Sequence, residues 1–303
     1  MNTAQLFDGA ITPAKLAMNS VTTEKIATNS ITADKLNLSD AELHTLVKAI
    51  KEYLSKPVEE FDWTVPLSAG TCLEMIWCDH GTFTMGSPSL EDKRESDEDQ
   101  HEVTLTKGFW LGKYQVTQAQ WYAVLGTDPS YFKGSQRPVE QVSYNDALTF
   151  CRRLTEKERA EGRLSDQYEY RLPTEAQWEY ACRAGTKTAL NNGTESNFSE
   201  VAWYNSNAGG VTHIVGQRKP NAWGFYDMPG NVWEWCLDWY NENYYRISPK
   251  EDPVESSTGS ARAMRGGSFD FPDHCCRSAD RGWCIPTDKK SHIGFRIALV
   301  SVE

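Results

Sequence analysis

Positive charge is scarce in this sequence of 303 residues, in which 31 Lys and Arg face 42 Asp and Glu for a formal net charge of −11. Nucleic acids and anionic membranes would be repelled by such a chain, so neither is expected as a partner. Long apolar runs are missing too. No stretch approaches the roughly 20 residues that a membrane-spanning helix needs, and the first residues lack the basic-then-apolar pattern of a secretory signal. We therefore expect neither membrane insertion nor export by the standard secretory route.

Familiar catalytic motifs are also absent from the sequence. It contains no glycine-rich phosphate loop, no nucleophile elbow and no His-Glu-x-x-His zinc motif. Its 8 cysteines lack the dense spacing of a disulfide scaffold, which favours a reduced compartment or assembly inside a cell. The acid-rich run 91–102 is predicted to be a solvated loop. Four cysteines with apolar neighbours are predicted to be buried: Cys72, Cys151, Cys182 and Cys236.

The first 38 residues carry a ten-residue repeat, with units that begin at Ile11, Val21 and Ile31. Apolar residues recur five apart, a spacing that fits neither one helix face nor the alternation of a strand. Units this small cannot bury a core alone and must stack on neighbours or on other chains. Residues 1–38 are therefore predicted to form an oligomerisation stalk. They resemble the stalk segments of phage tail-fibre proteins.

A helix is predicted over residues 39–56. Ser39 and Glu42 have the spacing of a capping box, and Pro57 ends the pattern. One narrow apolar seam runs along this helix: Leu43, Val47, Ile50 and Leu54. A trimeric bundle that continues the stalk is the favoured interpretation. The alternative is a helix that packs against its own globular domain.

Two helices are predicted in the rest of the chain, where glycine, tryptophan, asparagine and aspartate become frequent. Ser143 caps the first, which runs to Lys157. Thr174 caps the second, which runs to Ala184, and Gln177 is its reciprocal capping partner. Their apolar faces hold Ala147, Phe150, Cys151 and Leu154 in the first helix and Trp178, Ala181 and Cys182 in the second. Short strands and long loops are predicted elsewhere.

Six motifs follow one another in residues 65–303. They are GTFTMGS at 81–87, FWLGKYQVT at 109–117, RLPTEAQWEYA at 171–181, NAWGFYDMPGNVWEW at 221–235, RGGS at 265–268 and IGFR at 293–296. Together they resemble the formylglycine-generating-enzyme family. The resemblance implies a loop-rich α+β domain with an irregular fold related to C-type lectins.

The same resemblance bears on activity. Oxidases of the family use two cysteines, five residues apart, to bind copper and attack a substrate cysteine. Here Cys276 matches one position, but Phe271 stands at the other, and Cys275 is adjacent to Cys276 rather than spaced from it. A copper-dependent oxidase acting on cysteine peptides is therefore the alternative. The favoured interpretation is a non-enzymatic binding protein without catalytic residues or a catalytic cofactor.

Residues 269–292 resemble a different branch of the family, the variable proteins of diversity-generating retroelements. In those proteins asparagine codons are mutagenised at adenines to vary a ligand-binding face. Here the motifs RGGS, CRSA and IGFR enclose a mixture of unrelated side chains, most of which an asparagine codon reaches by changes in its first two bases, although Trp283 is not among them. The predicted ligand-binding residues are Asp270, Phe271, Asp273, His274, Cys275, Asp280, Gly282, Trp283, Cys284, Ile285, Ser291 and His292.

Two other interpretations of this segment stay open. One is an ordinary loop, although exposed aromatic and aliphatic side chains would lower the solubility of a monomer and so favour a contact surface. The other is a zinc site, whose ligand spacing would match no standard pattern. Its ligands would be His274, Cys275, Cys276, Cys284 and His292.

The family resemblance further implies a structural calcium ion. Its ligands would be the side chains of Asp227 and Glu234 and the carbonyl oxygens of Gly230 and Val232. Oxygen ligands from a tight loop suit Ca²⁺, which would also satisfy carbonyls that a loop leaves unpaired. The alternative is that Glu234 pairs with a neighbouring arginine.

The sequence therefore favours a receptor-binding tip protein of a phage or prophage tail. We expect a homotrimer formed by residues 1–56, contact with other tail proteins through the N-terminus, and binding of a protein or glycan receptor on a target cell through residues 269–292. Its expected location is the virion, after assembly in the host cytoplasm. A bacterial surface-displayed binding protein is the alternative.

Overall fold

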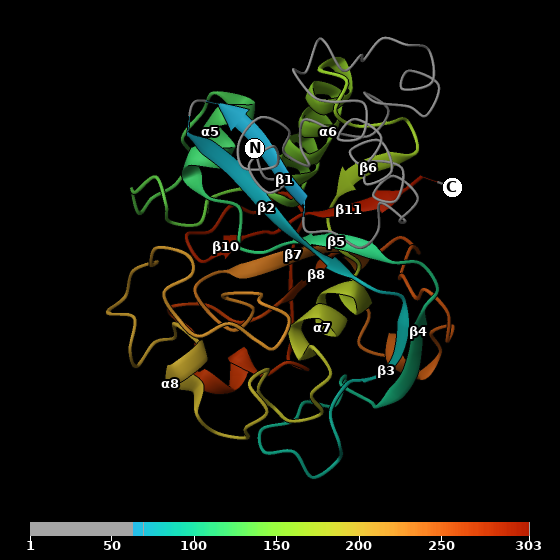
Figure 1. Cartoon of the computed structure of the whole chain (residues 1–303). Helices are drawn as coiled ribbons and strands as arrows, with labels where there is room; N and C mark the ends of the chain where they lie inside the picture. The colour runs from blue at the N-terminus through green and yellow to red at the C-terminus, as the bar shows by residue number, and fades with distance from the viewer. Residues whose placement is uncertain (1–62, 69, 303) are drawn as a thin grey trace, which may run out of the picture.

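The computed structural model describes residues 63–68 and 70–302. The predicted stalk of residues 1–38 and helix of residues 39–56 lie outside this range. Within it, no helix combines the length and the apolar character needed to cross a bilayer. The domain combines a few helices with short strands and long loops (Figure 1), which confirms the predicted loop-rich α+β class.

A five-stranded sheet joins the two ends of the domain. Its order is β1-β2-β5-β11-β6. The last strand, β11, lies antiparallel between β5 and β6, so the end of the described chain is held in the middle of the sheet. The strands are β1 (Trp63–Ser68), β2 (Thr71–Cys78), β5 (Phe109–Gly112), β6 (Tyr168–Arg171) and β11 (Ala298–Ser301).

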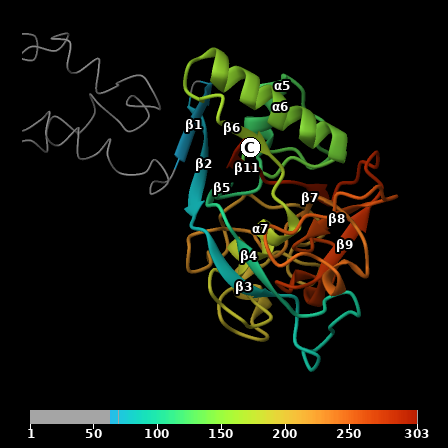
Figure 2. The same cartoon turned by 90° about the vertical axis from the view of Figure 1, so that its right-hand side faces the viewer.

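A second sheet of four strands carries the C-terminal part of the chain, in the order β10-β7-β8-β9. Strand β10 is parallel to β7, the other pairs are antiparallel, and β9 is an edge strand. Figure 2 shows β8 and β9 at one side of the domain. The strands are β7 (Trp233–Trp239), β8 (Arg262–Arg265), β9 (Arg281–Cys284) and β10 (Ile293–Gly294), and a separate two-stranded ribbon pairs β3 (Gly81–Met85) with β4 (His101–Leu105).

Three helices of at least two turns pack against these sheets. Helix α6 contacts β6, α5 contacts β1, β2 and α6, and α7 lies across β7 and β8 (Figure 1). The helical elements are α5 (Gln118–Leu125), α6 (Tyr144–Ala160), α7 (Glu175–Arg183), the single-turn α8 (Phe198–Val201), and the 3-10 turns η2 (Tyr244–Arg246) and η3 (Asp273–Cys276).

The two predicted helices are confirmed. Ser143 caps α6 and Thr174 caps α7, each through a capping box, and α6 continues three residues beyond Lys157. The predicted apolar face of each helix is buried. Helix α5 was not predicted, although Thr117 and Gln120 form a capping box that could have revealed it. Its eight residues are too few to show a clear apolar period, so the cap was the available signal.

Aromatic rings fill the core between the five-stranded sheet and helices α5 and α6. The ring of Phe150 lies 5.7 Å from that of Trp121 and 5.4 Å from that of Phe295, measured between centroids. All three side chains are buried. Of the four cysteines predicted to be buried, Cys151, Cys182 and Cys236 are, whereas Cys72 is exposed, because alternate positions of β2 face solvent.

We expect Phe150→Ala to lower the free energy of unfolding by about 3–5 kcal/mol, because it leaves a cavity that the surrounding rings cannot fill. Equilibrium unfolding in urea measures this change. The exposed Tyr122 on α5 provides the control, since Tyr122→Ala should change stability by less than about 1 kcal/mol. Equal losses for the two variants would contradict this description of the core.

Candidate ligand-binding face

Residues 269–292 run from the end of β8 through η3 and β9 to the start of β10. They therefore reach both edges of the four-stranded sheet, and only the short β9 among them forms regular strand pairs. Loops of this kind need other anchors for their backbone and side chains. The anchors here are buried arginines.

Arg265 is fully buried at the end of β8. Its guanidinium donates to Glu175 Oε1 at 3.0 Å and to Glu179 Oε2 at 2.6 Å, both on α7. It also donates to the carbonyl oxygen of Ser278 at 2.5 Å. Arg265 thus ties the loop after η3 to α7 and to the sheet.

Arg277 and Arg281 anchor the segment from within. Arg277 donates to Glu98 Oε1 at 2.6 Å and to Glu91 Oε1 at 2.8 Å. Arg281 donates to both carboxylate oxygens of Glu175, at 2.8 and 3.0 Å. Although burial alone would raise it, Arg281 and Arg265 hold the pKa of Glu175 at about 2. The carboxylate is therefore ionised throughout the physiological range.

The acid-rich run 91–102 is only in part the solvated loop that its composition predicted, because two of its carboxylates are buried. Glu98 is fully buried and Asp97 nearly so, because their carboxylates face Arg277 and Arg281. Composition alone could not show this, since the arginine partners lie about 180 residues further along the chain. The available signal was the pair of arginines inside a segment that was otherwise predicted to be exposed.

Three of the predicted ligand-binding residues belong to the scaffold instead. Asp280 is 5 % exposed and its carboxylate lies 3.2 Å from Arg277, while burial raises its pKa to about 7. Cys284 is buried because it lies on the inner face of β9. At Gly282 an added Cβ would lie 2.7 Å from the ring of Trp233, so a larger side chain cannot fit without a shift. The assignment of these three positions to a variable face is corrected.

Seven predicted residues are exposed or partly exposed and are together named the display surface: Asp270, Phe271, Asp273, His274, Cys275, Ser291 and His292. His292 joins its two ends, because its Nδ1 lies 3.3 Å from Asp270 Oδ2 and its ring lies 5.2 Å from that of Phe271. Burial opposes ionisation of Asp270, yet hydrogen bonds from His292 and Ser268 keep its pKa below the usual value. Phe271 is half-buried against Trp233, with ring centroids 5.7 Å apart.

Trp283 and Ile285 are the most exposed predicted residues of large apolar character, at 56 and 49 %. Successive side chains of a strand point to opposite faces, so Trp283 faces away from Gly282 and from the Trp233 side of β9. Its ring lies 6.1 Å from that of Tyr240. Trp283 and Ile285 therefore form a second exposed group, separated from the display surface by the edge strand.

Fixed loops border the display surface. The N–H of Asn205 donates to the carbonyl oxygen of Phe271 at 3.0 Å, and the ring of Phe132 lies 5.2 Å from that of Phe269. Beneath Phe132, the fully buried carboxylate of Glu140 accepts a hydrogen bond from the Phe132 N–H at 2.8 Å. Burial raises the pKa of Glu140 to about 7.

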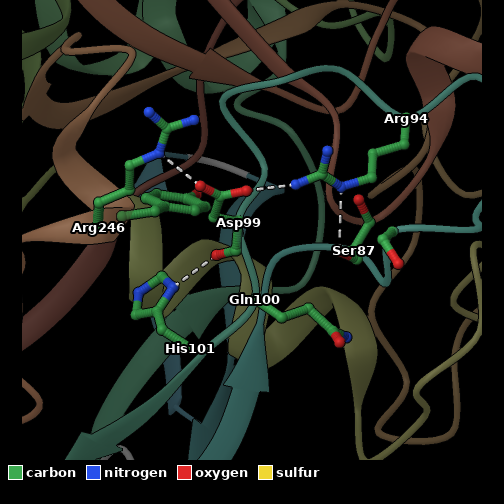
Figure 3. A pocket seen from close by; sticks show the side chains of 8 residues that line it. Ser87, Arg94, Asp99, Gln100, His101 and Arg246 are labelled. Atoms are coloured by element: carbon green, nitrogen blue, oxygen red, sulfur yellow. Dashed lines mark hydrogen bonds and ion pairs between the residues drawn. The ribbon is translucent and has the colours of Figure 1, made fainter.

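A shallow polar hollow lies where the acid-rich run meets η2, and the sequence did not point to it. Figure 3 shows Asp99 between Arg94 and Arg246, whose guanidinium nitrogens lie 2.5 and 2.6 Å from its carboxylate oxygens. Ser87 and His101 also line the hollow. Because one carboxylate already pairs with both arginines, we assign no function to this hollow.

The cysteines of the segment do not gather into a metal site. Among the described residues no group of three or more His, Cys, Asp or Glu is placed to hold a metal ion. Cys276 is buried beside Leu190 and Val201, whereas Cys284 Sγ lies 3.6 Å from Asp288 Oδ2. Burial raises the pKa of Cys275 to about 12 and that of Cys276 well above its usual value, so both are neutral thiols near neutral pH.

The predicted calcium ligands do converge, but on a protein atom. Gln115 Nε2 lies 3.2, 3.1 and 3.0 Å from the carbonyl oxygens of Asp227, Gly230 and Val232 and 3.0 Å from Glu234 Oε1. One carboxylate oxygen of Asp227 accepts from the Gly216 N–H at 2.6 Å, while the other is buried without a hydrogen-bond partner, as is Gln115 Oε1. Calcium needs oxygens at 2.3–2.6 Å from its centre, which is about 0.5 Å closer. With Gln115 Nε2 at this point, the set does not fit the ion.

The alternative for Glu234 is confirmed. Arg296 Nε donates to Glu234 Oε2 at 2.6 Å and Nη2 donates to Oε1 at 2.8 Å, with both residues fully buried. The Trp178 indole donates to the same carboxylate at 2.7 Å. The charge of Glu234 is thus balanced by the IGFR motif at the end of the segment.

We expect Arg277→Met to lower the free energy of unfolding by about 3–5 kcal/mol, because it leaves Glu98 and Glu91 buried without their partner. Trp283→Ala should change stability by less than about 1 kcal/mol, since its ring is largely exposed. Urea unfolding of both variants tests the distinction between scaffold and exposed residues. A larger loss for Trp283→Ala than for Arg277→Met would contradict it.

The raised pKa of Glu140 predicts a pH dependence. The folded state holds the proton to about pH 7, whereas the unfolded chain releases it near pH 4.3, so this group makes stability fall as pH rises between these values. We expect Glu140→Gln to remove that decline and to raise the melting temperature at pH 8. Melting temperatures from pH 5 to pH 8 measure the difference between variant and wild type. The exposed Glu156 on α6 gives the control Glu156→Gln, and parallel curves for wild type and Glu140→Gln would contradict the assignment.

Comparison with known proteins agrees with this architecture. The chain is 35% identical over 245 residues to the chaperone protein LppX of Paenibacillus barcinonensis. The aligned region covers 65% of this chain and 84% of that protein. It is 33% identical over 206 residues to the formylglycine-generating enzyme of Streptomyces coelicolor, which covers 63% of this chain and 60% of that enzyme.

Among solved structures, Treponema denticola variable protein 1 matches with a TM-score of 0.71 at 30% identity, covering 80% of this chain and 99% of that chain. The resemblance to variable proteins is thereby confirmed. The model of the sulfatase-modifying factor enzyme 1-like domain matches residues 62–300. This match includes the arginine-anchored segment and the buried RGGS and IGFR motifs, and it spans nearly all of the described domain. The chain therefore belongs to the family of sulfatase-modifying factor enzyme 1-like domains.

Proposed function

We propose that this protein is a non-enzymatic adhesin that binds a protein or glycan receptor through its display surface. One observation carries the proposal. Within residues 269–292 the arginines and Asp280 face inward to buried partners, while seven intervening residues are exposed or partly exposed. Such a segment can change its outward side chains without losing its anchors. The fold match to Treponema denticola variable protein 1 supports the same interpretation.

The finer form of the proposal is a phage or prophage tail-tip protein whose display surface is varied by a retroelement. Residues 1–56 would form a homotrimer that joins other tail proteins, which places the protein in the virion after assembly in the host cytoplasm. Three copies would also raise the avidity of weak contacts, by ~10² to 10⁴ where several sites engage together. A bacterial surface-displayed adhesin is the alternative location for the same binding activity.

The copper oxidase is the competing function, since relatives of this chain are formylglycine-generating enzymes. Phe271 occupies one of the two cysteine positions, and it packs against Trp233 rather than leaving space for a thiol. The other position, Cys276, is 1 % exposed. Its raised pKa disfavours the thiolate that binds copper and attacks a substrate.

Population sequencing of the gene tests the proposal. We expect differences between cells at codons for the display surface and for Trp283 or Ile285, and none at Arg265, Arg277, Arg281 or Arg296, because loss of a buried arginine unfolds the scaffold. A reverse-transcriptase gene and a near-copy of the coding segment for residues 269–292 should lie close by. An invariant segment would contradict diversification.

Two protein measurements separate binding from catalysis. Incubation of the full chain with a cysteine-containing peptide and added copper should yield no aldehyde, and turnover would contradict the non-enzymatic assignment. Adhesion to target cells should fall at least about tenfold in Phe271→Ala, because a packed aromatic at an interface contributes about 2–3 kcal/mol. Tyr122→Ala, on the exposed face of α5, provides the matched control.

A further inference from the structure

Gln115 lies at the junction of three segments. It follows β5, precedes α5, and its fully buried side chain reaches the loop 227–232 and the first part of β7. That loop contains Asp227 and Asn231, both with positive φ of 52° and 65°. Such a backbone turns its carbonyl oxygens inward, where they need a partner with positive charge or hydrogens to donate.

The partner is a single nitrogen atom. Four oxygens surround Gln115 Nε2 at 3.0–3.2 Å, three from carbonyl groups and one from the carboxylate of Glu234. A side-chain amide carries two hydrogens, so they are shared among the four acceptors. The amide nitrogen is the positive end of a dipole, which is the electrostatic role that a bound cation would otherwise have in a ring of oxygens.

Glu234, the carboxylate that accepts from the amide, already has a cationic partner. Arg296 makes two hydrogen bonds to the carboxylate of Glu234 and donates to the carbonyl oxygens of Tyr226 and Asp227 at 3.0 and 3.3 Å. The charge of Glu234 is therefore matched by that of Arg296. The neighbouring carboxylate of Asp227 is also buried, where it accepts from the Gly216 N–H and burial raises its pKa to about 6. A divalent cation at the position of Nε2 would have to displace the amide.

We infer that the amide of Gln115 takes the place of a structural calcium ion in this chain, so the fold of loop 227–234 is independent of calcium. The inference goes beyond the proposed adhesin function and does not rest on it. It concerns stability and metal content, which are measured without any receptor.

Gln115→Glu is the decisive variant, because it preserves the shape of the side chain and replaces the donor nitrogen by an oxygen. The new carboxylate would face Glu234 and three carbonyl oxygens with no hydrogens between them. Such a cluster of oxygens requires a cation, and calcium suits it. We expect the melting temperature of the variant to depend on calcium, unlike that of the wild type.

The experiment uses the full chain, stripped with EGTA and then heated in EGTA, in about 1 mM CaCl₂ or in about 1 mM MgCl₂. The wild type should melt within about 1 °C in all three solutions and carry no stoichiometric calcium by mass spectrometry. Gln115→Glu should melt at least about 4 °C lower than wild type in EGTA and regain half or more of this loss in calcium. Its metal content should rise to about one calcium per chain.

Gln118→Glu is the matched control. The Gln118 amide donates to the carbonyl oxygens of Phe132 and Pro138 at 2.7 and 3.2 Å, with no carboxylate among its acceptors. This variant should lose the same stability in EGTA and in calcium. A comparable recovery of Gln118→Glu in calcium would overturn the assignment, since the effect would then not be specific to position 115.

The wild-type protein alone can also overturn the inference. Calcium that copurifies with it at one ion per chain, or a melting temperature that falls by several degrees in EGTA, would show that the ion and not the amide orders the loop. Should Gln115→Glu fail to fold in EGTA, calorimetric titration of the wild type with CaCl₂ decides the question. Saturable binding with one site would refute the inference, and no binding would support it.

Discussion

The buried pairing of arginines with carboxylates is the interaction on which the rest of this structure depends. A guanidinium cannot be deprotonated in a protein, so each buried arginine requires acceptors placed around it in a fixed geometry. Arg265, Arg277 and Arg281 obtain theirs from α7 and from the acid-rich run, elements that lie far apart in sequence. Removing one partner would leave an uncompensated charge in the core. The pairs therefore define where each loop must lie, even where no strand or helix holds it.

In this arrangement, the residues that stabilise the segment 269–292 differ from the residues that it exposes. The anchors point inward, and Asp280 and Gly282 complete the scaffold because one pairs with Arg277 and the other leaves room for Trp233. The display surface contributes little to the anchoring, apart from Phe271 and Cys275, which pack against the core. A surface of this kind can be selected for what it contacts. That property is what a binding protein needs, and it is also why the loss of the second family cysteine is compatible with the fold.

Buried carbonyl oxygens, like buried charges, need partners, and here a neutral side-chain amide donates to them. The loop before β7 turns three carbonyls toward one point, where Gln115 donates to all of them. Arg296 compensates the adjacent Glu234. Both residues belong to recognisable motifs of the family, so two motifs that lie far apart in the sequence meet at this loop.

The sequence by itself was enough to predict the family motifs, the capped helices α6 and α7 and the limits of the candidate segment, because each of these depends on residues that are close together along the chain. Periodicity and capping are local properties, and Ser143 and Thr174 were readable as caps for that reason. Only the tertiary structure decided which residues of 269–292 are exposed, since Asp280 is buried with Arg277 against the distant Glu98 and Cys284 is buried by packing in the core. It also decided that Asp97 and Glu98 of the run 91–102 are buried against arginines and that the amide of Gln115 lies among the predicted calcium ligands. A long-range contact leaves no periodic trace in a single sequence, so charge composition could predict a solvated loop but could not reveal the arginines that remove two of its carboxylates from solvent.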